Sequence, residues 1–187
     1  DSDKFRFKSV RIIRSVISKD LSHFNDLFVS KHLLIKKYNE LYNTTDDLNL
    51  KTEILCFNLL VGNDIINSFE SLACNNTESN SKLIYQTLVS LDDSLAVRFY
   101  TTKFESLPSL SKYYALNFMH SNNKYLLQKY LDKIINDSNP LDLSYLLIFL
   151  INSGFKYELN DNFSNPLNVF LLRILNKDIN SALESVD

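Results

Sequence analysis

The sequence predicts an all-α protein of stacked antiparallel helices, arranged as a helical repeat or a bundle. Hydrophobic residues recur at helical spacing through most of the chain. Glycine occurs only 2 times and proline 3 times in 187 residues, which leaves little turn chemistry for a sheet of short strands. Short polar links separate segments of about 10–20 residues, a length that suits helix pairs folded back on one another.

The first predicted helix covers residues 3–20 and has two faces of different chemistry. Its hydrophobic residues fall on one broad arc, and Phe7 lies off that arc. They are Phe5, Val10, Ile12, Ile13, Val16 and Ile17. The other side carries five cations with no acid among them, which we name the basic stripe. The basic stripe consists of Lys4, Lys8, Arg11, Arg14 and Lys19.

Further helices follow at short intervals along the chain. We expect them over residues 21–42, 48–61, 64–73, 81–90, 95–104, 109–120, 124–135 and 167–175. The acidic end of the link at 43–47 can cap the next helix, and Gly62 is suited to end it. Residues 75–81 form the most polar stretch and predict an exposed loop.

The character of the sequence changes at Pro140. A dense hydrophobic segment at 141–151 ends at Ser153-Gly154, and residues 155–159 alternate between hydrophobic and polar, as a strand does. Residues 160–166 predict a loop. We therefore expect a helical stack over 1–139 and an appendix over 140–187 that is either winged-helix-like or helical.

The residue patterns of common catalytic and metal sites are missing from the sequence. His23, His32 and His120 form no paired motif, and the two glycines cannot build a phosphate loop. Adjacent Asp92 and Asp93 would diverge by about 100° on a helix, so they fit a helix N-terminus better than an acid–base pair. We therefore expect no catalytic residue, no cofactor, no metal and no small-molecule substrate: this chain is not expected to be an enzyme.

The remaining residues of interest fit packing better than chemistry. Cys56 lies in a hydrophobic run and predicts a core thiol. A group of aromatic residues at helical spacing predicts core or inter-helix packing, with an exposed partner groove as the alternative. The group comprises Phe99, Tyr100, Phe104, Tyr113, Tyr114 and Phe118. No hydrophobic run is long enough to cross a membrane, and two cysteines make no disulfide framework, so we expect an intracellular protein, nuclear or cytoplasmic.

Charge is distributed unevenly along the chain. Residues 1–37 hold 9 Lys or Arg and 4 Asp, a net of +5, whereas the whole chain has a net charge of −2. The basic stripe is either a solvated helix face or a surface that contacts nucleic-acid phosphates or an acidic partner. No base-reading motif accompanies it, so we expect no sequence-specific recognition.

Several short motifs resemble the SAC/GANP family of PCI-like scaffolds. The motifs are Arg6 to Arg14, Tyr38 to Tyr42 followed by Glu53 to Leu60, Ser94 to Tyr100 followed by Leu107 to Leu110, and Pro140 to Leu147. The resemblance implies a helical scaffold that ends in a winged helix and seats other protein subunits. It also implies a place in an mRNA-export or transcription-coupled complex.

A second resemblance uses some of the same residues. Ile84 to Asp93, with Ala96 and Tyr100, is similar to part of the poxviral Bcl-like immune-evasion proteins. That resemblance implies a compact helical bundle that binds and inhibits host apoptosis or innate-immune signalling proteins, with 141–151 as a buried central helix. A helical adaptor of another kind is the third possibility.

Overall fold

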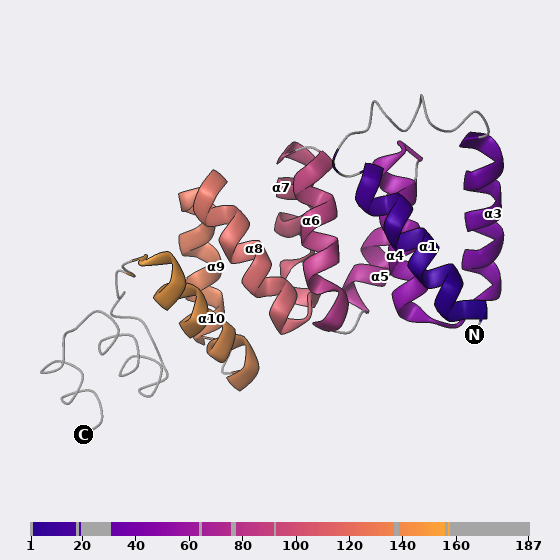
Figure 1. Cartoon of the computed structure of the whole chain (residues 1–187). Coiled ribbons are helices and arrows are strands. Elements are labelled where there is room, and N and C mark those ends of the chain that lie inside the picture. The colour runs from indigo at the N-terminus through magenta and orange to yellow at the C-terminus, as the bar shows by residue number, and fades with distance from the viewer. Residues whose placement is uncertain are drawn as a thin grey trace, which may run out of the picture. The chain divides into compact units, whose positions relative to one another are not determined.

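The computed structural model describes residues 2–17, 19, 31–63, 65–75, 78–91, 93–136, 139–155 and 157. Every regular element in these ranges is a helix (Figure 1), so the predicted all-α class is confirmed. None of the described helices combines the length and hydrophobicity needed to cross a bilayer. The chain divides into two compact units, Asp1–Pro108 and Ser109–Asp187.

The first unit is organised around one central helix. Its helices are α1 (Ser2–Ile17), α3 (Lys31–Thr44), α4 (Leu48–Leu60), α5 (Ile66–Cys74), α6 (Ser81–Leu91) and α7 (Asp93–Lys103), with 3-10 turns η1 (Glu78–Asn80) and η2 (Phe104–Ser106). Helix α4 packs against α1, α3, α5 and α6. In α4, Leu50 and all of 52–60 are buried, as expected for a helix enclosed on every side.

Local capping fixes both ends of α4, as the sequence predicts. The Asp47 side chain accepts hydrogen bonds from the backbone N–H groups of Asn49 (2.8 Å) and Leu50 (3.3 Å), which satisfies two N-terminal donors. Just beyond the other end, Gly62 has a φ of 81°, a left-handed conformation that glycine adopts without steric cost. The predicted boundaries of this helix are therefore confirmed.

Aromatic and aliphatic side chains fill the core of the first unit. The rings of Tyr38 and Phe57 meet edge to face, with 4.7 Å between their centroids. The rings of Phe69 on α5 and Phe99 on α7 are tilted by 57° to each other, with 5.9 Å between their centroids. The buried core cluster joins four residues of α4 to three residues of α1 and α3: Leu50, Ile54, Phe57 and Leu60 with Val10, Ile17 and Tyr38. The prediction that the aromatic residues serve packing is confirmed for Phe99, which is fully buried.

The second unit contains α8 (Ser109–Asn122), α9 (Lys124–Asn136) and α10 (Pro140–Ser153), and α10 packs against both others. The Asn139 side chain caps α10 by accepting from the N–H of Leu141 at 3.0 Å. Gly154 ends the helix with a φ of 63° and donates to the Leu150 carbonyl at 3.1 Å. These short-range interactions explain why the change of character at Pro140 marks a helix start.

Polar groups also hold the second unit together. Lys112 on α8 donates to buried Asp142 on α10 across 2.5 Å. The Tyr157 hydroxyl donates to Asp132 on α9, and the same carboxylate accepts from Gln128 at 3.0 Å. Tyr157 is buried at 2% exposure and belongs to no strand.

Parts of the sequence-based description fall on residues outside those that the structure describes. They are 20–30 at the start of the predicted second helix, and 158–187, which contain most of the expected strand, the loop at 160–166 and the helix at 167–175. The winged-helix appendix therefore stays a prediction. The division of the chain at 139–140 also stays a prediction. Within the described part, one face of α10 is exposed at Leu141, Ile148 and Ile151, so 141–151 is not buried on all sides.

The expectation of an exposed loop over 75–81 is wrong at its C-terminal end. Residues 78–80 form a 3-10 turn, and Asn80 and Ser81 are buried. The reason is a tertiary hydrogen bond, because the Asn80 side-chain amide donates to Asn49 Oδ1 at 2.8 Å. That bond draws the turn onto the start of α4.

Candidate functional site

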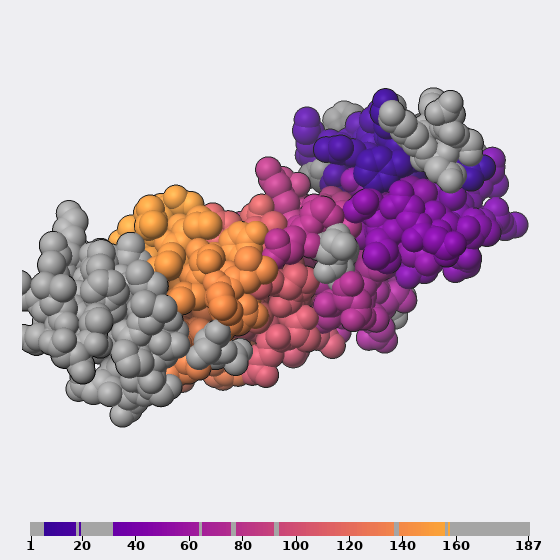
Figure 2. Space-filling model, turned by 90° about the horizontal axis from the view of Figure 1, so that it is seen from below, coloured from indigo at the N-terminus to yellow at the C-terminus, as the bar shows by residue number. Residues whose placement is uncertain are grey.

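The orientation of α1 decides which of its residues are available for function. Phe7, Val10, Arg14 and Ile17 are three and four positions apart, so at about 100° per residue they fall within about 80° of one another. Val10 and Ile17 are buried against α4, and Phe7 packs on the same core. Figure 1 shows α1 lying diagonally across α4, and in Figure 2 its indigo side chains lie against the purple surface of residues 31–60.

This orientation differs from the one that the hydrophobic pattern predicts. Ile12 and Val16, placed on the core side by the sequence, are 64% and 44% exposed. Phe7, placed off the hydrophobic arc, packs against the core instead. The row that packs on α4 includes Arg14, a residue that a purely hydrophobic criterion assigns to solvent.

The basic stripe is therefore divided. Lys8, Arg11 and Lys19 are exposed, as expected. The backbone of Lys4 belongs to α1, and its side chain lies outside the described part of the structure. The expectation that Arg14 faces solvent is wrong, since this residue is 9% exposed.

Arg14 is withdrawn from solvent because α4 supplies a buried acid. Its Nε donates to Glu53 Oε2, and the two side chains are only 11% and 6% exposed. A buried charge needs a partner, and Glu53 lies within the hydrophobic run of α4. An acidic residue within a hydrophobic run is the one sequence signal that could have predicted a basic partner for Glu53. It does not indicate which Lys or Arg that partner is.

A hollow of about 440 Å³ opens beside this ion pair, between α1, α4, η1 and α6. We name it the α1–α6 pocket. Three cations line it, Arg11, Arg14 and Lys82, against the single carboxylate of Glu53. The other lining residues are Phe7, Asn49, Ser79, Asn80, Leu83 and Gln86.

One wall of the α1–α6 pocket is a fixed amide. Asn49 Oδ1 accepts from Asn80 Nδ2 at 2.8 Å and from the Ser79 hydroxyl at 3.5 Å. Because the oxygen is engaged, the amino group of the Asn49 side chain is the end left to donate. Gln86 adds a second, exposed amide on α6.

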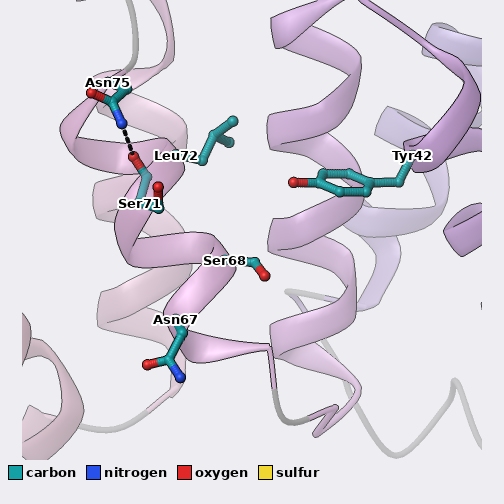
Figure 3. Close-up of a pocket in the computed structure, with 6 residues that line it drawn as sticks. All are labelled: Tyr42, Asn67, Ser68, Ser71, Leu72 and Asn75. Atoms are coloured by element: carbon teal, nitrogen blue, oxygen red, sulfur yellow. Dashed lines mark hydrogen bonds between the residues drawn. The ribbon is translucent and has the colours of Figure 1, made fainter.

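A second hollow of about 430 Å³ has a different chemistry (Figure 3). It lies between Tyr42 at the end of α3 and one side of α5, and its lining contains no charged residue. The Tyr42 hydroxyl points toward the side of α5 that carries Ser68 and Leu72. The Asn75 side chain donates to the Ser71 carbonyl at 2.9 Å. Apart from Leu72, the lining offers only uncharged hydrogen-bonding groups, so this hollow has no charge with which to select an ionic ligand.

The candidates for chemistry are dispersed. His32 is exposed on α3, His120 packs edge-on against Phe149 at 5.8 Å, and His23 lies outside the described residues. Asp93 is the first residue of α7, in agreement with the predicted helix start. Across the ranges that the structure describes, no three His, Cys, Asp or Glu residues gather as a metal site would require.

Cys56 is the core thiol that the sequence predicts. It is fully buried in α4, and that burial raises the pKa of its thiol from 9.0 to about 12. Since the thiolate is the nucleophilic form, the side chain is held unreactive. Cys74 is half-buried, with its sulfur 3.2 Å from the Ser106 hydroxyl.

Comparison with protein-family models, with curated proteins and with solved structures gave no match for this chain.

Proposed function

We propose that this chain is a non-catalytic helical adaptor that binds partner proteins, and that it uses the outer face of α1 to do so. The outer face consists of Lys8, Ile12 and Val16, which are four positions apart and so form one row along the helix. All three are exposed, Ile12 at 64% and Val16 at 44%. The exposure of the two hydrophobic residues on this row, Ile12 and Val16, is the observation that carries the proposal.

The chemistry of the outer face suits a protein partner. Burying hydrophobic side chains is the main source of association free energy, and isoleucine and valine supply it here. Lys8, with Arg11 and Lys19 nearby in sequence, adds positive charge around that row. A hydrophobic centre with basic flanks is complementary to an amphipathic helix that carries acidic residues.

The family resemblance supplies the finer form of the proposal. As a SAC/GANP-like, PCI-like scaffold, the chain would seat protein subunits of an mRNA-export or transcription-coupled complex, in the nucleus or the cytoplasm. The motifs named above support this form. The proposal assigns no catalytic, cofactor or metal role to any residue.

A second candidate is a bundle of the poxviral Bcl-like kind that inhibits host apoptosis or innate-immune signalling proteins. Its support is the position of α4, which packs against α1, α3, α5 and α6 as the central helix of a compact unit. In this form the central helix is α4 rather than the segment at 141–151.

Affinity purification from the native source, with the full chain as bait, tests the proposal. The double variant Ile12→Glu, Val16→Glu should lose the specific partner, because it places charge in a hydrophobic contact. Tyr125→Glu is the matched control, since Tyr125 is 81% exposed and lies on α9 of the second unit. Export or transcription subunits would support the first form, and host death or innate-signalling proteins the second.

A partner that is retained equally by all three proteins would contradict the role of the outer face. Recovery of no partner above background would contradict the adaptor function itself. Nucleic acid, the other partner expected from the basic stripe, is distinguished by salt. Phosphate contacts would give a log–log slope of about −0.7 to −0.9 per contact, and a hydrophobic protein contact would not.

A further inference from the structure

We propose that the α1–α6 pocket binds a phosphate monoester. This is a ligand site in addition to the outer face of α1, and it does not depend on the adaptor function. The group could belong to a free phosphorylated small molecule or to a phosphorylated side chain, and both present the same dianion to the pocket.

The charge of the pocket fits this ligand. Arg11, Arg14 and Lys82 supply three positive charges and Glu53 one negative charge, which leaves a surplus of two. A phosphate monoester carries about −1.5 to −2 at neutral pH, so it matches the surplus, whereas a carboxylate neutralises only half of it. Arg11 and Lys82 have exposed side chains on opposite helices and can close on a ligand from two sides.

Arg14 is oriented for binding before any ligand arrives. Among the described residues its side chain has one polar partner, Glu53, and that bond uses Nε. The two terminal amino groups of the guanidinium are then the forked pair that fits two oxygens of a phosphate. Because Glu53 already immobilises the side chain, little rotamer entropy remains to be lost on binding.

Neutral donors complete the pocket. The side-chain amino group of Asn49 is directed by the two hydrogen bonds that its oxygen accepts, from Asn80 at 2.8 Å and Ser79 at 3.5 Å. Gln86 offers another amide from α6. Phosphate oxygens accept several hydrogen bonds at once, so a mixed set of guanidinium, ammonium and amide donors suits them.

The same geometry disfavours a polynucleotide as the ligand. A nucleic-acid backbone is bound by cations spaced along its path. Here Arg14 is withdrawn into the pocket, so the cations converge on one hollow rather than forming a continuous line. Lys8 and Lys19 are exposed and do not line the pocket.

Titration of the full chain with inorganic phosphate and O-phosphoserine, followed by amide NMR, tests the proposal. We expect saturable shifts of the Asn49, Asn80 and Gln86 amide signals, and weaker binding of acetate. Arg11→Gln and Lys82→Gln should each weaken O-phosphoserine binding about five- to tenfold, since each removes one charge-assisted contact. Lys8→Gln and Lys19→Gln are the matched controls and should leave the affinity unchanged.

A peptide library with one phosphoserine, and its unphosphorylated copy, separates the two sources of the group. A phosphopeptide that binds at least about tenfold more tightly than O-phosphoserine identifies a phosphorylated side chain, and equal affinity identifies a small molecule. Three results would overturn the proposal: no saturable binding, equal loss in the control variants, or binding of single-stranded RNA with no response to O-phosphoserine.

Arg14 is left unchanged in these variants because its removal would leave the buried Glu53 carboxylate without a cation and destabilise the first unit. Thermal unfolding of Arg11→Gln and Lys82→Gln should match that of the wild type, because both side chains are exposed. Failure of this site would leave the partner contact at Ile12 and Val16 untouched, so the two proposals fail separately.

Discussion

Replacing Glu53 by leucine removes the one described polar partner of the Arg14 side chain and leaves its guanidinium in place. Replacing Arg14 by methionine leaves the Glu53 carboxylate without its cation. The two side chains are 11% and 6% exposed, so each single substitution leaves one buried charge without its partner. The double substitution removes both charges.

The burial sets the expected size of the effect. Breaking a buried pair costs about 3–5 kcal/mol, whereas an exposed pair contributes about 0–1 kcal/mol. Since Arg14 borders the α1–α6 pocket and can reach water there, we expect the lower value, about 3 kcal/mol, for each single variant. The double variant should lie within about 1 kcal/mol of the wild type, because well-packed hydrophobic residues can replace a buried pair.

Urea unfolding followed by circular dichroism measures the four proteins of this cycle, and amide exchange in α1 and α4 assigns the change to the first unit. Lys103→Met is the control, since Lys103 pairs with Glu70 at 3.1 Å and is 35% exposed. That variant should lose less than about 1 kcal/mol.

Losses below about 1 kcal/mol in both single variants, or a double variant equal to their sum, would refute the buried pair. Such a result would return Arg14 to the solvent-facing stripe that the sequence predicts.

Four further predictions concern other parts of the chain. Lys112→Met should destabilise the second unit by about 3 kcal/mol in urea unfolding, because it strands Asp142, which is 2% exposed. In the native protein a thiol reagent should modify Cys74 alone, and Cys56 should react only on unfolding. The raised thiol pKa of Cys56 means that its contribution to stability is complete below pH 9.0 and declines as the pH rises toward about 12. The difference in unfolding free energy between the wild type and Cys56→Ala, measured across that range, checks the sign, because the raised pKa values of the tyrosines are common to both proteins. Gly154→Ala should cost about 1–2 kcal/mol in thermal unfolding, through the left-handed backbone alone, since an added Cβ would meet nothing within 4 Å.

The sequence alone predicted the helix ends that are determined by interactions between neighbouring residues. Asp47 and Gly62 mark the ends of α4 through bonds and backbone angles that involve only neighbouring residues. Gly154 ends α10 in the same way. The all-α class follows from the scarcity of glycine and proline and from hydrophobic residues that recur at helical spacing along most of the chain.

The features that the sequence did not predict depend on contacts between residues far apart in the chain. Nothing local distinguishes α4 as the helix that four others enclose, because its buried face includes Thr52, Glu53 and Asn58 as well as hydrophobic residues. Asn80 is buried through a bond to Asn49, 31 positions away. The α1–α6 pocket draws on α1, α4, η1 and α6, so its members share no sequence motif.

The orientation of α1 leaves two hydrophobic side chains, Ile12 and Val16, exposed on its outer face. On a helical wheel Arg14 lies about 40° from Val10, so a row centred on Val10 and Ile17 takes Arg14 inward. The alternative would bury Ile12 and Val16, which are worth about 1.5–3 kcal/mol each when fully covered. The isolated chain lacks that stabilisation, and the partner that we propose for the outer face would supply it. Partner binding should therefore raise the unfolding temperature of the first unit in proportion to the logarithm of partner concentration. The Ile12→Glu, Val16→Glu variant should show no such rise, whereas Tyr125→Glu should behave as the wild type. An equal rise in all three proteins would place the partner elsewhere and leave the exposure of Ile12 and Val16 without a functional cause.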